Sequence, residues 1–335
     1  MTGRTITGVS DSRLRRLIAR HPAGLHRLSD PAYLLSSDLP AAAAAVLRQC
    51  DGAELFHETI ILRPSARIEL CRPPLPAVAG SGPVYWVGEI AGDDLYVDLR
   101  GRVYRSESDT GEWLAEGSRF DRWLLGAVAA EAVLYDDDGE FAADRFDESG
   151  ELSPKAVVRT CRRVLDHDAD APGPRWRLAR ALVRLGDVER ARDELETVVA
   201  GRPDFAWAWF DLAQISEQLG QPGAALDELC AAAEAIPAYE HAGFLWAHAA
   251  RVAHAMGDEP RRAELAGRAL DRDPGLVRAQ RDGARATLRG AEDEDDGDPR
   301  AALSLAELAA ALAPRDIETL DLLRQIRAAL QRQGG

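Results

Sequence analysis

The chain has 335 residues, of which 41 are basic and 56 are acidic, so its formal net charge at pH 7 is −15. A chain of this length can hold two domains, and its acidic balance argues against nucleic acid, which needs a basic face. The four cysteines are too widely spaced for a disulfide framework or a zinc site. No apolar run approaches a membrane span, and residues 1–30 lack the apolar core of a secretory signal. We therefore expect a cytoplasmic protein that binds neither nucleic acid nor membrane.

The first 150 residues mix short helical and β-rich segments. Helices are predicted over residues 11–20 and 39–50 and from Ser118 onward. Between the last two lie short runs rich in β-branched and aromatic residues, which favour strands, at residues 54–56, 59–63, 66–70, 84–90, 94–99 and 102–105. Arg100-Gly101 predicts a two-residue hairpin turn, and residues 72–83 predict a loop. This order of elements predicts an α+β fold built on antiparallel strands.

A different period begins after residue 150. Ser153-Pro154 predicts the start of a helix over residues 154–167, because Ser caps helices and Pro suits the first helical position. Beyond it the sequence repeats at an interval of 34 residues. Leu178, Ala179, Gly186, Ala191, Leu195 and Pro203 recur as Leu212, Ala213, Gly220, Ala225, Leu229 and Pro237. We therefore predict an α+β domain over residues 1–150 and an all-α domain over residues 151–335.

Each copy of the repeat predicts a pair of short helices. Gly ends the first helix in a left-handed conformation, and Pro follows the second helix because it cannot continue it. A third copy contains Trp246, Ala250, Gly257, Ala269 and Pro274, and is displaced by three residues around residues 238–241. A fourth copy contains Gly297, Ala302, Ala309 and Pro314, with extra length in an acidic loop. Residues 316–332 predict a closing helix, since a stack of repeats needs a more polar end.

This pattern resembles the tetratricopeptide repeat (TPR), in which the first helix of each pair lines a concave groove. Carrying the groove positions over selects Trp176, Arg180, Arg184, Trp207, Phe210, Gln214, Glu217, Phe244, Arg251 and His254. Aromatic and Arg side chains are common anchors of protein interfaces. The resemblance therefore implies a groove that binds a protein or peptide partner, and the Arg residues suggest an acidic one. The alternative is that Trp207 or Phe244 packs against the next helix or the first domain.

A second resemblance covers about residues 30–135. An LP-led helix ending in Asp51-Gly52, the run GAELF, a Tyr-Val-Asp strand before Gly101, and the run FDRWL at 120–124 resemble the SUKH superfamily. That superfamily includes Smi/Knr-like cell-wall regulators and bacterial immunity proteins that neutralise toxins. The resemblance implies a binding fold without catalytic residues, and places residues 106–117 in a variable connection.

Motifs for catalysis or metal binding are incomplete in this sequence. His57-Glu58 begins like a zinc-protease helix, but Ile61 stands where the second His is needed. The acidic run at 136–139 hints at a calcium loop, but Leu134 and Arg145 stand where oxygen ligands are needed. We therefore predict no catalytic residues, no metal site and no cofactor.

Together these patterns predict a non-enzymatic protein-binding adaptor. Its sharper form, implied by the resemblance alone, is a bacterial immunity or regulatory protein whose partner is a toxin. One alternative is that the repeats only buttress the first domain. Another is an enzyme with a divergent site within residues 50–105.

Overall fold

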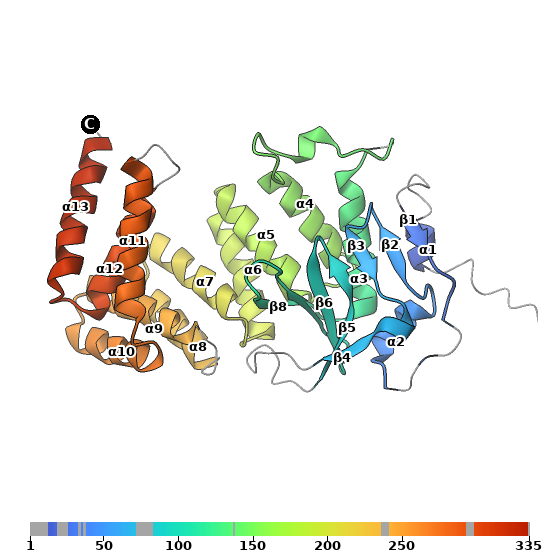
Figure 1. The fold of residues 1–335 in the computed structure, drawn as a ribbon, viewed down its shortest axis with the longest axis horizontal. Coiled ribbons are helices and arrows are strands. Elements are labelled where there is room, and N and C mark those ends of the chain that lie inside the picture. The colour runs from blue at the N-terminus through green and yellow to red at the C-terminus, as the bar shows by residue number, and fades with distance from the viewer. Residues whose placement is uncertain are drawn as a thin grey trace, which may run out of the picture. The chain divides into compact units, whose positions relative to one another are not determined.

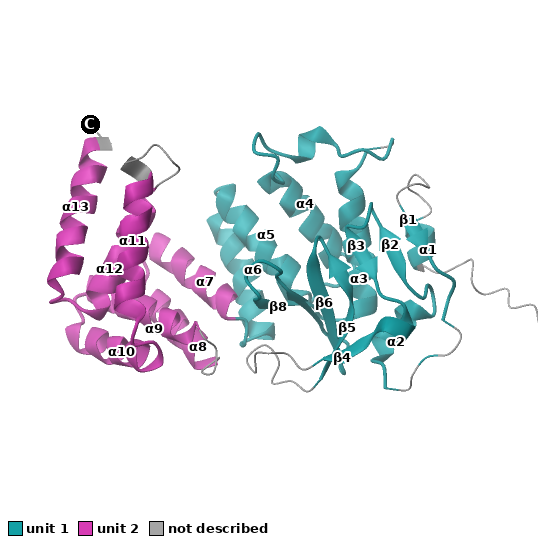
Figure 2. Cartoon of the chain, in the orientation of Figure 1, with its two compact units in different colours: residues 1–205 teal, residues 206–335 magenta. Residues whose placement is uncertain are grey.

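The computed structural model describes residues 13–18, 26–32, 35, 38–71, 83–136, 138–235, 241–292 and 298–333. It contains two compact units, residues 1–205 and residues 206–335 (Figure 2), and each is described by itself. An antiparallel sheet region followed by a series of helices confirms the predicted fold class (Figure 1). Most of the predicted loop at 72–83, most of the displacement around 238–241 and most of the acidic loop at 291–298 lie outside the described residues, as do the predicted repeat positions Pro237 and Gly297.

An antiparallel sheet is the centre of the first unit. Its described strands are β1 (His26–Leu28), β2 (Ala53–Leu55), β3 (Ile60–Leu62), β4 (Glu69–Cys71), β5 (Val84–Ile90), β6 (Asp93–Asp98), β7 (Val103–Ser106) and β8 (Trp113–Gly117). They lie in the order β1-β2-β3-β5-β6-β7-β8, and β4 also pairs with β5. β3 pairs with the last residues of β5 and β4 with its first residues, so both strands use one edge of β5.

Several local predictions need correction. Residues 65–67 form a short 3-10 helix, so the strand predicted over 66–70 begins only at Glu69. The β6–β7 hairpin is present, but its loop has three residues, because the Asp98 N–H donates to the Arg102 carbonyl. Residues 106–117 contain β8, all of whose residues are buried, and are not simply a connection. The edge strand β1 was not predicted.

Helices cover one face of the sheet. α1 (Arg13–Ile18), α2 (Ala41–Leu47) and α3 (Phe120–Glu131) pack there around a core that contains Leu55 and Trp123. A smaller cluster of Val84, Tyr104 and Trp113 lies apart from that core. Burial of these apolar side chains, at about 25 cal/mol per Å², is the main driving force for the unit.

Three further helices belong to the same unit. They are α4 (Pro154–Leu165), α5 (Pro172–Arg184) and α6 (Val188–Gly201). α4 packs against α3, and α5 packs against α4, α6 and β8. Ser153 caps α4 as predicted, because its side chain accepts a hydrogen bond from the Ala156 N–H. The first copy of the repeat is thus part of the compact unit that holds the sheet, while a division of the chain at residue 150 remains a prediction.

A buried ion pair joins β8 to α5. Glu116 is 2% exposed, and Arg177 donates to its two carboxylate oxygens at 2.9 and 2.5 Å. The Trp123 indole N–H donates to the same carboxylate at 3.2 Å. Burial alone would raise the pKa of Glu116, but the charge and hydrogen bonds of Arg177 lower it below its ordinary value. The pair therefore stays ionised in the interior, where breaking it would leave an uncompensated charge.

A second buried carboxylate organises the start of α3. Asp168, in the loop between α4 and α5, is 1% exposed. It accepts hydrogen bonds from the Ser118 and Arg119 N–H groups at 2.9 and 3.4 Å and from the Ser118 hydroxyl. We predicted α3 to start at Ser118, but Ser118 lies before the helix, which begins at Phe120. The backbone N–H groups just before α3 thus donate to Asp168, which lies 50 positions after Ser118 in the sequence.

The second unit consists of helices in its described part. They are α7 (Ala206–Gln218), α8 (Pro222–Ala235), α9 (Ala242–Ala255), α10 (Glu259–Arg272), α11 (Leu276–Glu292), α12 (Pro299–Leu312) and α13 (Ile317–Gln333). α7 pairs with α8, α9 with α10, and α11 with α12, and α13 closes the unit against α12. The predicted glycines Gly186, Gly220 and Gly257 follow α5, α7 and α9 with φ of 81°, 69° and 77°.

The fourth pair departs from the others. Its second helix, α12, packs against both α9 and α10. The buried Arg262 side chain of α10 donates to the Ala311 carbonyl near the end of α12 at 2.7 Å. This contact satisfies one of the carbonyl groups that a helix leaves unpaired at its C-terminus.

We expect Arg177→Met to lower the free energy of unfolding by about 3–5 kcal/mol, because it leaves the Glu116 carboxylate buried without its counter-charge. Adding Glu116→Gln should restore most of this loss, since Gln removes the charge and keeps an acceptor for Trp123. Denaturant unfolding of the two variants measures the difference. Equal stabilities would mean that the ion pair does not hold α5 to the sheet.

We expect Gly220→Val to cost about 1 kcal/mol or more, because a β-branched residue resists positive φ. A Cβ at Gly220 would have no heavy atom within 4 Å, so the cost is conformational and not steric. Gly220→Asn is the matched control, since Asn tolerates the left-handed region. Thermal unfolding should rank the parent first, Asn next and Val last; a Val variant as stable as Asn contradicts the explanation.

Candidate functional site

The groove residues from the first copy of the repeat lie on α5. Trp176 is only 9% exposed, and its ring centroid lies 5.4 Å from that of Phe205. The Arg180 guanidinium stacks over the Trp176 ring at 4.9 Å. Arg180 and Arg184 are exposed. Trp176 therefore belongs to the packed interior and does not line an open groove surface, whereas the two Arg side chains are accessible.

The sheet covers part of this α5 face. Gly173, Trp207 and Phe244 are equivalent positions in successive copies, separated by 34 residues and then by 37 because of the three extra residues. A Cβ on Gly173 would lie 2.4 Å from a Glu116 carboxylate oxygen and 3.0 Å from the Ala115 carbonyl. Only glycine fits there, because β8 occupies the space that an aromatic ring fills in the later copies.

In the second unit the predicted aromatic residues come together. We call the rings of Trp207, Phe210, His241, Phe244 and His248 the aromatic face. The centroids of neighbouring rings lie 4.4–6.4 Å apart, with Phe244 next to both Phe210 and His248. The first two residues come from α7, and the others lie on α9 or at its N-cap. All five side chains are half-buried, so the rings pack against one another and still retain exposed surface.

Charged and polar side chains border the aromatic face. Arg251 of α9 forms an ion pair with Glu217 of α7, and both side chains are about three-quarters buried. Gln214, one turn before Glu217, is exposed. His254 is exposed and pairs with Glu259 at 2.8 Å. A carboxylate that approaches Arg251 must therefore compete with Glu217, a contact that the sequence did not predict.

His248 is one of the two histidines in the aromatic face, and burial shifts its pKa. Its ring lies 4.8 Å from Phe210 and 4.4 Å from Phe244. Burial, and to a smaller extent the charge of Arg251, lower its pKa from 6.5 to about 3. The imidazole is therefore neutral near neutral pH, and acts as a polar aromatic ring in this cluster.

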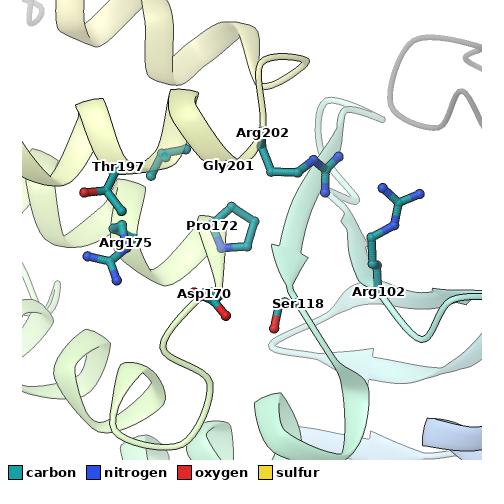
Figure 3. A pocket seen from close by; sticks show the side chains of 10 residues that line it. Arg102, Ser118, Asp170, Pro172, Arg175, Thr197, Gly201 and Arg202 are labelled. Carbon is teal, nitrogen blue, oxygen red and sulfur yellow. The ribbon is translucent and has the colours of Figure 1, made fainter.

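The first unit contains a separate cleft that the sequence did not predict (Figure 3). Its volume is about 380 Å³. The lining residues are Arg102, Gly117, Ser118, Asp170, Pro172, Arg175, Thr197, Val198, Gly201 and Arg202. These residues come from the β6–β7 loop, the end of β8, and the helices α5 and α6 with the segments that flank them. We call this site the arginine cleft.

The incomplete motifs of the first unit are turns. Phe56, His57 and Glu58 have φ of 54°, 52° and 71°, so His57-Glu58 belongs to a left-handed turn between β2 and β3. Asp136 Oδ1 accepts from the Asp138 and Glu140 N–H groups at 3.0 Å, so this carboxylate stabilises its own turn. Among the described residues no group of three or more His, Cys, Asp or Glu side chains is placed to hold a metal ion.

Comparison with known proteins identifies the repeats. Residues 177–241 match the tetratricopeptide repeat family, a range that runs from within α5 through α8. Residues 177–241 therefore carry tetratricopeptide repeats, as predicted for the first two copies. No curated protein matches the sequence. In the described part of the chain, no helix has the length and apolar character needed to traverse a bilayer.

Solved structures of repeat proteins are similar to about half of the chain. MamA from Desulfovibrio magneticus RS-1 is 21% identical, with 49% of this chain and 88% of that chain covered and a TM-score of 0.33. YrrB, a TPR protein with an unusual peptide-binding site, is 18% identical, with 50% and 81% covered and a TM-score of 0.33. PilF from Pseudomonas aeruginosa is 14% identical, with 54% and 78% covered and a TM-score of 0.36.

We expect the free energy of unfolding to decrease as the pH falls, because of His248 in the aromatic face. The folded pKa of His248 is about 3, below its ordinary value of 6.5, so between these values the unfolded chain binds a proton that the folded chain excludes. The loss between pH 7 and pH 5 should be about 2 kcal/mol. His248→Phe should lose correspondingly less over the same interval, as measured by denaturant unfolding at the two pH values. His254→Gln, which changes an exposed histidine, should keep the dependence of the parent; the same dependence in all three proteins would contradict the assignment.

Proposed function

We propose that this protein is a non-enzymatic adaptor that binds a protein or peptide partner on the helices α7 and α9. The observation that supports this most directly is the aromatic face, a cluster of half-buried rings on the first helices of two consecutive repeats. Aromatic side chains that keep part of their surface exposed and stand next to an Arg are typical anchors of protein interfaces.

In the first copy of the repeat, the equivalent face of the first helix binds a carboxylate of the same chain. There α5 receives the Glu116 carboxylate of β8, bound by Arg177 through two hydrogen bonds. The positions equivalent to Arg177 are Asp211 and His248, so the later copies lack this Arg. Their nearest counterpart is Arg251, which is one turn further along α9 than His248. We therefore propose that an acidic segment of the partner binds next to Arg251, with its apolar side chains on the aromatic face.

Glu217 sets the strength of this interaction. Because Glu217 already neutralises Arg251, an incoming carboxylate gains only the difference between two similar ion pairs. Such an exchange lowers affinity for acidic segments in general and favours partners that also fill the apolar part of the face. Specificity of this kind arises from a difference of affinities.

The sharper form of the proposal is a bacterial, cytoplasmic immunity or regulatory protein whose partner is a toxin. It is supported by the resemblance of residues 30–135 to the SUKH superfamily and by an antiparallel sheet with helices packed on it in that region. The strand β8 departs from the resemblance, which placed residues 106–117 in a variable connection. For the first copy of the repeat, a buttressing role is also favoured, because the Glu116–Arg177 pair holds α5 against β8.

We expect a photo-crosslinking amino acid at Gln214 to capture one discrete partner in cells, because this exposed position borders the aromatic face. The same amino acid at Asp227, an exposed position of α8, is the matched control and should not capture it. Mass spectrometry of the crosslinked peptide identifies the partner and the segment bound. Equal capture at the two positions would contradict binding on this face.

Charge variants then test how the partner is held. Arg251→Glu should weaken binding about tenfold or more, because it removes a charge-assisted hydrogen bond. Glu217→Gln should strengthen it, because Arg251 loses its competing partner. The double variant Arg180→Glu with Arg184→Glu probes the exposed charges of the first copy. Weakening by this variant and not by Arg251→Glu would move the binding site to the first unit.

A further inference from the structure

The structure assigns a second binding role to the arginine cleft: we propose that it binds a small phosphate monoester. The cleft belongs wholly to the first unit and shares no residue with the aromatic face. Its Arg102 and Arg202 side chains extend toward each other from different elements (Figure 3). This inference does not depend on the identity of the protein partner.

Both guanidinium groups are held in place by ion pairs, and Arg102 has donor groups that its ion pair does not use. Arg102 donates to Asp98 through Nε alone, at 2.7 Å. Arg202 donates to Asp204 through Nε and Nη2, at 2.7 and 2.8 Å. The pair with Asp98 therefore leaves both terminal nitrogens of Arg102 for other acceptors, whereas Arg202 also hydrogen-bonds to the Tyr104 hydroxyl. Side chains fixed in this way lose little additional freedom when a ligand binds.

The guanidinium groups of Arg102 and Arg202 both lie near the ring of Tyr104. The Arg102 and Arg202 guanidinium carbons lie 5.9 and 5.7 Å from the centroid of its buried ring. Their side chains are 30% and 14% exposed, so solvent screens them only partly. Each is paired with an Asp, so the attraction for an anion comes from the guanidinium N–H groups that these carboxylates do not engage, and not from a net positive charge.

The arrangement suits a phosphate group better than a carboxylate. One guanidinium fork can satisfy the two oxygens of a carboxylate, whereas a terminal phosphate offers three oxygens that two forks from different directions can share. Asp170 also lines the cleft, away from the two guanidinium groups (Figure 3), and would repel an anion placed beside it. The phosphate therefore belongs next to Arg102 and Arg202, with ligand hydroxyl groups toward Asp170.

The remaining wall leaves room for an organic group. A volume of about 380 Å³ is at the lower end of the range for small-molecule sites. Pro172, Val198 and Gly201 give this wall an apolar part. A Cβ on Gly201 would meet no heavy atom within 4 Å, so this position opens onto free space. The ligand class that fits is a small phosphorylated molecule.

Calorimetry on the full chain at constant ionic strength tests the proposal with glycerol 3-phosphate, inorganic phosphate, glycerol and succinate. We expect saturable binding of glycerol 3-phosphate, weaker binding of phosphate, and none of glycerol. Arg102→Gln and Arg202→Gln should each weaken binding about tenfold or more. Arg190→Gln, which alters an exposed Arg paired with Asp187, should have no effect. Succinate binding as tight as that of glycerol 3-phosphate would overturn the choice of phosphate.

Gly201→Leu provides a test that leaves the ion pairs intact. Its side chain should fill the cleft and abolish binding without lowering the thermal midpoint, because nothing opposes it in the folded chain. Gly223→Leu, at an exposed helical position of α8 that is also unobstructed, is the matched control and should bind normally. Absence of saturable binding in the parent chain, or normal binding by Gly201→Leu, would overturn the proposal.

Discussion

The pairing of Glu116 with Arg177 is the constraint on which the first unit depends. A carboxylate that is 2% exposed is costly unless a cation and hydrogen bonds compensate it. Arg177 and Trp123 supply both, so β8, α3 and α5 must meet at one point. The arginine cleft lies beside this junction, and its walls keep their spacing because β8 and α5 cannot separate without exposing the charge. The buried ion pair thus fixes how β8, α3 and α5 meet, and contributes less to the net stability of the unit.

The same face of the first helix is covered by the sheet in the first copy of the repeat and is partly exposed in the second and third copies. In the first copy, Gly173 lets β8 approach α5 and Trp176 packs into the interior. In the second and third copies, the positions equivalent to Gly173 are Trp207 and Phe244, and their rings build a cluster with exposed surface. Whether this face is covered or partly exposed depends on the side chain at the position of Gly173, Trp207 and Phe244. An aromatic ring and a β-strand cannot occupy the same space there.

The two candidate sites differ in the physics of recognition. The aromatic face offers apolar area, and its Arg is already paired, so affinity there depends on shape and on burial. The arginine cleft combines a partly apolar wall with two guanidinium groups, and the N–H groups that their Asp partners do not engage favour a compact anion. A single acidic chain can therefore bind an anion, because local placement of two Arg side chains outweighs a net charge of −15 that is spread over the surface and screened by salt.

The sequence by itself determined the elements whose signals are local. The repeat period located the helix pairs, the glycines after α5, α7 and α9 were identified from their spacing, and residues 84–90 were identified as a strand from their composition. Tertiary structure alone decided that β8 covers α5, that Glu217 neutralises Arg251, and that Arg102 and Arg202 share a cleft. Glu116 and Arg177 are 61 residues apart, and neither has a neighbour in the sequence that indicates the other. Local patterns record backbone preference and which side of a helix is apolar, whereas the partner of a side chain depends on segments that only folding brings together.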